Sequence, residues 1–201
     1  MYQDSDFQIW DDQTLPGRLG KIRTILDPKF LATVADLQAV LAELDRPIYP
    51  HVALHRRRTK NPPPDSWVAL SASKRGYKKL PHFEIGLWDD RLYVWLVVLE
   101  EATNRLAVLD RVPAALVAAL PTDFECANDH TDKLATQPLT PVSYQRLLDD
   151  QQIQRHAEWL LGRDFQRGSA FFTGSAEEQA ATIRETVVAL MPIYQALLES
   201  E

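Results

Sequence analysis

Imidazole and carboxylate side chains, the groups that bind divalent metals and transfer protons in proteins, recur in the middle of this sequence. His51 and His55 stand four residues apart, and "PHFEIGLW" places His82 two residues before Glu84. Residues at even spacing share one face of a strand, so each pair lies on one face of its own strand. If both strands turn these faces to the same side of a sheet, they form a polar pocket to which a later loop would add Asp129 and His130.

The spacing of these groups matches no tight metal-binding motif, and the register of the strands is not given by the sequence. Polar residues along a solvated sheet face would produce the same pattern. We therefore expect neither a metal nor another cofactor. An enzyme that uses His51, His55, His82 and Glu84 for acid–base chemistry remains an alternative hypothesis.

Positive charge is concentrated in the same part of the chain. The segment from residue 51 to 82 contains eight Lys/Arg and one acid, whereas the whole protein has a net charge of -6. Guanidinium and ammonium groups bind phosphate, and Tyr77 and Trp67 lie close enough in sequence to stack on a base. The candidate anion-binding residues are Arg56, Arg57, Arg58, Lys60, Lys74, Arg75, Tyr77, Lys78 and Lys79.

Strand geometry would separate the three consecutive arginines. Arg57 would share a face with the histidines, and Arg56 and Arg58 would lie on the other face. Either Arg57 joins the histidines around a compact anion, or Arg56 and Arg58 follow a polymer together with Lys60. A third interpretation is that the charges protect a sheet edge from aggregation.

Two kinds of periodicity divide the first half of the chain. After the helix-start signal Asp27-Pro28, apolar residues recur at helical spacing as far as Arg46, where a proline follows. A shorter helix is predicted over residues 18–26. The pattern then becomes that of strands, and we predict four, over residues 48–58, 67–72, 81–88 and 91–99.

Apolar residues divide these strands into faces. Phe83, Ile85 and Leu87 alternate with His82 and Glu84, so the third strand has one apolar and one polar face. The fourth strand, "LYVWLVVL", is apolar on both faces, which is typical of a central strand that is covered on both sides.

Helices are predicted for most of the second half. Alanine and leucine favour helix over residues 103–120, and a Thr-Pro pair opens a helix expected to span residues 140–161. Ser175 and Glu178 form a capping box for the last helix. Short strands are expected within residues 122–131 and 164–172.

The whole chain is typical of one α+β domain over residues 1–201, with a largely antiparallel central sheet packed against N-terminal and C-terminal helices. Its only cysteine, Cys126, excludes an internal disulfide and a cysteine-based zinc site. No Gly-rich nucleotide loop or G-x-S-x-G motif is present. We expect a cytoplasmic protein, because the start of the chain lacks the order of a signal peptide and its longest apolar run is too short to cross a membrane.

The stretches "RRTKNPPPDSWVA" and "KRGYKKLPHFEIGLW", with "DPKF", "NDHT" and "AEWLLG" outside them, resemble the YktB-like family of bacterial proteins, a domain of unknown function. The resemblance covers most of the chain and is densest between residues 51 and 100. It implies a compact α+β fold in a cytoplasmic bacterial protein. It implies no reaction, substrate or catalytic residue.

Three classes of function follow from the residues. The leading hypothesis is a noncatalytic binding protein whose basic segment, residues 51–82, meets an anionic partner such as nucleic acid or a phosphorylated metabolite. The alternatives are the small-molecule enzyme with the His/Glu pocket and a protein-interaction module that docks an acidic partner. An enzyme requires convergence in a concave pocket, whereas a nucleic-acid binder requires a broad basic surface.

Overall fold

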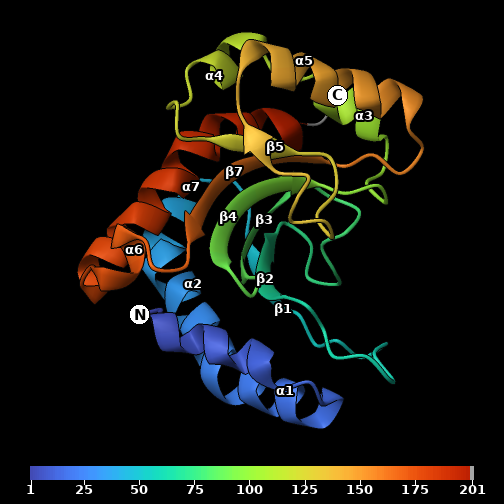
Figure 1. The fold of residues 1–201 in the computed structure, drawn as a ribbon. Helices are drawn as coiled ribbons and strands as arrows, with labels where there is room; N and C mark the ends of the chain where they lie inside the picture. Colours follow the sequence, from blue (N-terminus) through green and yellow to red (C-terminus); the bar gives the residue numbers. More distant parts are fainter. Residues whose placement is uncertain (200–201) are drawn as a thin grey trace.

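A single seven-stranded sheet organises residues 1–199, which the computed structural model describes (Figure 1). The order across the sheet is β1-β2-β3-β4-β7-β5-β6, and each neighbouring pair is antiparallel. The strands are β1 (Tyr49–Val52), β2 (Ser66–Ser71), β3 (His82–Leu87), β4 (Arg91–Val98), β5 (Glu125–Ala127), β6 (Gln137–Pro138) and β7 (Trp159–Gln166). This sheet with its helices confirms the predicted α+β class.

The helices precede, interrupt and follow the strands in sequence. Before the sheet come the 3₁₀ helix η1 (Asp4–Asp11), α1 (Leu15–Lys21), the π-helical turn η2 (Ile22–Leu26) and α2 (Asp27–Leu41). The remaining helices are α3 (Arg105–Leu109), α4 (Ala114–Ala118), α5 (Pro141–Ile153), α6 (Ala170–Thr173) and α7 (Ala176–Leu198). Figure 1 shows α7 running along the sheet beside β7, with α4 and α5 gathered near β5. None of the described helices combines the length and the apolar character that a membrane span requires.

The predicted helix signals are found at the helix ends. Pro28 occupies the first turn of α2, which begins at Asp27 as predicted but ends at Leu41. At the start of α7, the Ser175 hydroxyl accepts a hydrogen bond from the backbone N–H of Glu178, and the Glu178 carboxylate accepts one from the backbone N–H of Ser175. This reciprocal pair confirms the predicted capping box.

One face of the sheet, hereafter the helix-covered face, carries the main apolar core. It is formed by alternate residues of the strands, among them Phe83, Ile85 and Leu87 of β3, as the sequence predicts. Phe83 packs edge-on against Tyr194 of α7, with ring centroids 4.8 Å apart. β4 lies at the centre of the sheet and is buried on both faces, which confirms its predicted position.

The first strand is shorter than the sequence indicates. β1 ends at Val52, where it pairs with Val68, and residues 53–65 leave the sheet as a loop. The prediction of a strand as far as residue 58 is wrong because its partner β2 begins only at Ser66, after the three prolines, which cannot donate to a ladder.

The segment around Trp159 is a strand and not the end of a helix. α5 ends at Ile153, and β7 begins at Trp159 and pairs with β4 along eight residues. A short apolar run fits a buried strand as well as a buried helix, so periodicity alone misassigned it. The strand predicted over residues 164–172 is correct only as far as Gln166, because Gly168 turns the chain at φ 76° before α6 begins.

Candidate functional site on the loop-covered face

The opposite face of the sheet is covered by connecting segments, and we call it the loop-covered face. The pairing register aligns His51, Ala69, Glu84 and Trp95 in one row across β1 to β4. The loops that contribute side chains above this face are residues 53–65, 72–81 and 128–136. The strand residues of this face include Trp67, His82, Tyr93, Leu160 and Asp164.

Two stacked aromatic rings lie at the middle of this face. The ring centroids of Tyr93 and Trp95 are 4.4 Å apart, and both side chains are buried. Each ring lies where its neighbouring strand has a glycine. A Cβ atom on Gly86 would meet the Tyr93 ring at 2.4 Å, and one on Gly162 would meet the Val94 carbonyl oxygen at 2.1 Å and the Trp95 ring at 2.3 Å. These two positions therefore require glycine for a steric reason.

His82 and Glu84 form a buried pair. The His82 Nε2 and Glu84 Oε1 atoms are 3.1 Å apart, and His82 Nδ1 lies 2.8 Å from the Leu80 carbonyl oxygen. Both ring nitrogens of His82 thus have partners, and Glu84 is only 1% exposed. The pair helps to hold the loop-covered face together and presents no free imidazole nitrogen to a substrate.

Trp67 and Tyr77 join the loops to one another. The Trp67 indole N–H donates to the Tyr77 hydroxyl at 3.1 Å. The Tyr77 ring contacts His82 and His51, with centroids 4.8 and 5.7 Å apart. The Trp67 ring in turn contacts two further histidines, His55 at 5.6 Å and His130 at 6.4 Å. The structure therefore brings all four candidate histidines around one Trp–Tyr pair.

His51 and His55 reach this cluster from different kinds of backbone. His51 lies on β1, and its Nε2 is 2.8 Å from the Ser73 carbonyl oxygen. His55 lies in the loop after β1 with φ 48°. The prediction that it shares a strand face with His51 is therefore wrong. Burial, reinforced by Arg58, lowers the pKa of His55 to about 4. A neutral His55 is the form that this site favours at neutral pH.

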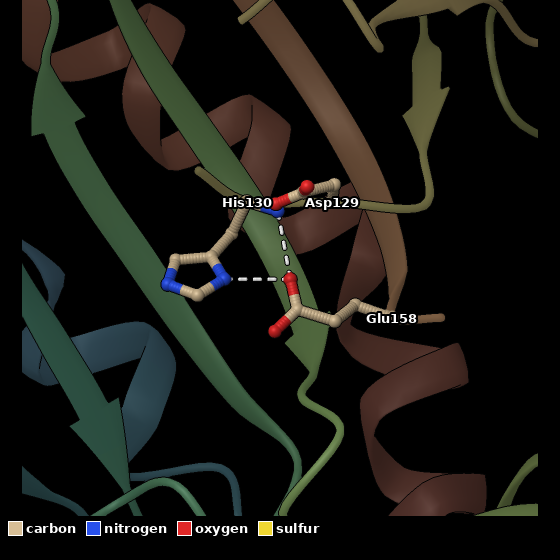
Figure 2. A group of neighbouring side chains, drawn as sticks. All are labelled: Asp129, His130 and Glu158. Carbon is tan, nitrogen blue, oxygen red and sulfur yellow. Dashed lines mark hydrogen bonds and ion pairs between the residues drawn. The ribbon is translucent and has the colours of Figure 1, made fainter. Parts of the chain in front are cut away.

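A second His–Glu pair lies where β5 ends and β7 begins (Figure 2). Glu158 directly precedes β7, and its backbone N–H donates to the Asn128 carbonyl oxygen at 2.8 Å, just beyond the paired residues of β5 and β7. The Glu158 Oε2 atom accepts from the backbone N–H of His130 at 2.7 Å and lies 2.6 Å from its Nδ1. Asp129, which sequence reasoning paired with His130, lies beside them.

The electrostatic surroundings of His130 favour its charged form. Burial alone would lower its pKa, but the hydrogen bond to Glu158 and the nearby carboxylates of Glu84 and Asp65 raise the pKa of His130 to about 9. Asp65 is itself only 6% exposed, and burial raises the pKa of this carboxyl to about 7. Two acids that were not among the predicted site residues, Asp65 and Glu158, are therefore central to the site.

Sequence signals for these two acids were weak. Glu158 lies in the segment assigned to a helix, so its position at the end of a strand was hidden. Asp65 is the single acid of a basic segment and follows three prolines, which marks it as a loop residue only.

The eight predicted anion-binding cations are all exposed. They lie on two loops, hereafter the basic loops, which are residues 53–65 and 72–81. Lys78 pairs with Glu101 at 2.8 Å. The other seven form no ion pair within residues 1–199: Arg56, Arg57, Arg58, Lys60, Lys74, Arg75 and Lys79.

The predicted separation of the three arginines onto two strand faces is wrong. Arg56 and Arg57 occupy a turn, in which the backbone N–H of Arg58 donates to the His55 carbonyl oxygen at 3.0 Å. The three side chains therefore belong to one exposed loop. Tyr77, the only uncharged residue of the predicted anion site, is partly buried against Trp67 and the histidines.

Fold and site together define an α+β protein with one antiparallel sheet, a helix-covered apolar face and a loop-covered face rich in histidine and buried carboxylate. Residues 2–194 match the family described as "Domain of unknown function (DUF1054)", and the chain belongs to this family. The match agrees with the resemblance to YktB-like proteins.

Similar proteins come from several bacteria. A "UPF0637 protein" of Levilactobacillus brevis is 61% identical over 198 residues, which cover 98% of this chain and 99% of the relative. Another of Latilactobacillus sakei subsp. sakei is 40% identical, covering 97% and 98%. A third of Leuconostoc citreum is 37% identical with the same coverage. The similarity thus extends over the sheet, the helices and the three loops of the site.

Proposed function

We propose that this chain is a noncatalytic binding protein that holds an extended polyanion, specifically single-stranded nucleic acid, against its basic loops. The observation that supports this proposal is the set of seven exposed Lys and Arg side chains on these loops that have no ion-pair partner within residues 1–199. Clustered cations in an acidic chain make a local field that attracts phosphates even when the net charge is -6.

The separation of the two loops favours a polymer over a compact phosphate. Residues 53–65 enter β2 at Ser66, and residues 72–81 leave it after Ser71. At roughly 3.3 Å per residue, these two ends are about 17 Å apart. A strand with several phosphates can contact cations along both loops at once.

Recognition would depend on charge and not on base stacking. Trp67 and Tyr77, the aromatic residues nearest to the basic loops in sequence, are hydrogen-bonded to each other and packed against histidines. Their faces are therefore occupied. Binding should accordingly be insensitive to base sequence and steeply dependent on salt, with a log–log slope of about -0.7 for each phosphate contacted on a single strand.

The test is a fluorescence-anisotropy titration of labelled single-stranded RNA and DNA at two salt concentrations. One variant combines Arg56→Ala, Arg57→Ala, Arg58→Ala and Lys60→Ala, and a second combines Lys74→Ala, Arg75→Ala and Lys79→Ala. A matched control removes three exposed cations outside the basic loops, Arg146, Arg155 and Arg184. All three variants should keep the melting temperature, because exposed substitutions usually change stability by less than about 0.5 kcal/mol.

We expect each loop variant to weaken binding and to reduce the salt slope, and the control to bind like the wild type. No binding at low salt, or equal loss in the control, would refute the proposal. Nucleoside phosphates serve as the comparison ligand. If nucleoside phosphates bind tightly at both salt concentrations and the polymers do not bind, the ligand is a compact phosphorylated metabolite and not a polyanion.

A further inference from the structure

Three potential metal ligands converge at the ends of β5 and β7, outside the basic loops. We propose that Asp129, His130 and Glu158 bind one divalent cation of the Zn²⁺ or Mn²⁺ class. This proposal does not depend on the polyanion proposal. It differs from the expectation of a metal-free chain, which rests on the absence of a tight metal-binding motif in the sequence.

The backbone brings these ligands together. β5 and β7 are antiparallel, with Ala127 opposite Leu160 as the last pair. Just beyond this pair the Glu158 backbone N–H donates to the Asn128 carbonyl oxygen, so Glu158 lies beside the start of the loop that carries Asp129 and His130. Glu158 stands two residues before Leu160, which lies on the loop-covered face, and its carboxylate contacts the His130 ring. Figure 2 shows the Glu158 carboxylate facing the His130 ring, with the Asp129 carboxylate beside the His130 backbone.

The donor atoms are close to the spacing that one ion requires. One ligand atom from each residue lies within 4.8 Å of the other two. Two bonds of about 2.0–2.2 Å to a common ion span at most about 4.4 Å. Small side-chain rotations are therefore sufficient to close the site.

An independent observation, the charge balance beneath the loops, also indicates a cation. Three carboxylates are at least nine-tenths buried there, those of Asp65, Glu84 and Glu158. Histidines pair with Glu84 and Glu158, whereas no ion pair joins Asp65 to another of residues 1–199. The strongest charged neighbour of Asp65 is His130. A divalent ion next to His130 would add positive charge close to these buried carboxylates.

The donor set restricts the class of metal. One imidazole with two carboxylates suits first-row divalent ions, whereas Mg²⁺ and Ca²⁺ prefer oxygen ligands alone. Asp65 would act from outside the ligand set, by its charge. Outer groups of this kind typically change metal affinity by about 10–100-fold.

The test is calorimetric titration of chelator-treated protein with Zn²⁺ and with Mn²⁺, with Mg²⁺ as the comparison ion. The ligand variants are Asp129→Asn and His130→Gln. The matched control is His156→Gln, because His156 forms an exposed pair with Glu100 to which residues 1–199 add no third ligand. Thermal unfolding of each metal-free variant shows whether it is folded.

We expect one equivalent of Zn²⁺ or Mn²⁺ to bind the wild type and His156→Gln with equal affinity. Asp129→Asn and His130→Gln should each lose at least about tenfold in affinity. Asp129 is only partly buried in its loop, so Asp129→Asn keeps the test informative if His130→Gln unfolds. Absence of binding in the wild type, unchanged binding in a folded Asp129→Asn, or equal loss in His156→Gln would each overturn the proposal.

Discussion

The two faces of the sheet are equally buried along β3, but there they are chemically opposite. On β3, Phe83, Ile85 and Leu87 point to the helix-covered face, and His82 and Glu84 point to the loop-covered face. All five side chains are 1% exposed or less. Burial therefore does not distinguish a face that provides stability from a face that holds charge. The covering elements distinguish the two faces: helices with apolar stripes cover the first face, and loops cover the second.

The difference has an energetic reason. Apolar side chains gain free energy on burial without needing partners, so any helix with a matching stripe can cover them. Buried imidazoles and carboxylates need hydrogen bonds or charge compensation from specific atoms. Loops can supply these atoms individually, as the Leu80 carbonyl does for His82 and the His130 backbone N–H does for Glu158. The loop-covered face is thus the region where ligand binding can alter the charge balance.

The largest expected effect is on the helix-covered face. Phe83→Ala should lower the free energy of unfolding by about 3–5 kcal/mol, because it leaves a cavity between β3 and Tyr194 of α7. Urea denaturation measures the loss. Leu31→Ala on α2, whose side chain is exposed, is the control and should change stability by less than about 0.5 kcal/mol. A loss below about 1 kcal/mol for Phe83→Ala would show that this face is not the main stabilising core.

A smaller effect is expected where the loop-covered face is most tightly packed. Gly162→Ala should cost about 1–3 kcal/mol, since its methyl group would overlap the Val94 carbonyl and the Trp95 ring. Gly20→Ala in α1 is the matched control: its Cβ would meet nothing within 4 Å, and alanine favours helix. Thermal unfolding compares the two. If Gly162→Ala melts like the wild type, the close contact of β4 and β7 is misplaced.

The two faces also differ in how far the sequence predicts them. Alternation in "PHFEIGLW" correctly separates Phe83 from His82, and the apolar run of β4 correctly predicts a central strand. These predictions succeed because burial of apolar residues follows a simple period. The capping residues of α7 are likewise local, so Ser175 and Glu178 are readable without knowledge of the rest of the chain.

The loop-covered face depends on information that is not local. His130 and Glu158 meet only because β7 inserts between β4 and β5, a strand order that no spacing in the sequence specifies. The segment around Trp159 was predicted as a helix, so Glu158 was not recognised as a site residue at the start of a strand. The arginine turn was misassigned for a related reason: the length of β1 is decided by where β2 begins, and not by residues 53–58 themselves.

The smallest expected effect is a pH dependence at the edge of the loop-covered face. Burial, with the neighbouring Asp164 and Asp123 carboxylates, raises the pKa of Glu125 to about 7, although Arg91 and the backbone N–H of Asp164 act in the opposite direction. A carboxyl whose pKa is raised by folding binds more protons in the folded state. The wild type should therefore lose stability as the pH rises from about 4.5 to 7, and the loss should be complete above that range.

Glu125→Gln should remove the part of this dependence that Glu125 contributes, whereas the part that Asp65 contributes should remain. The amide oxygen can still accept the hydrogen bond from the Asp164 N–H, so the local structure should be kept. Because Glu125 is partly exposed, solvent screening limits the gain to about 1 kcal/mol, a rise of roughly 2–4 °C in melting temperature at pH 8 and little change at pH 4.5. Glu177→Gln on the exposed side of α7 is the control and should shift the melting temperature equally at both pH values. The interpretation fails if Glu125→Gln shifts the melting temperature equally at pH 4.5 and at pH 8. The difference between the two shifts measures the effect of the ionised Glu125 carboxylate alone.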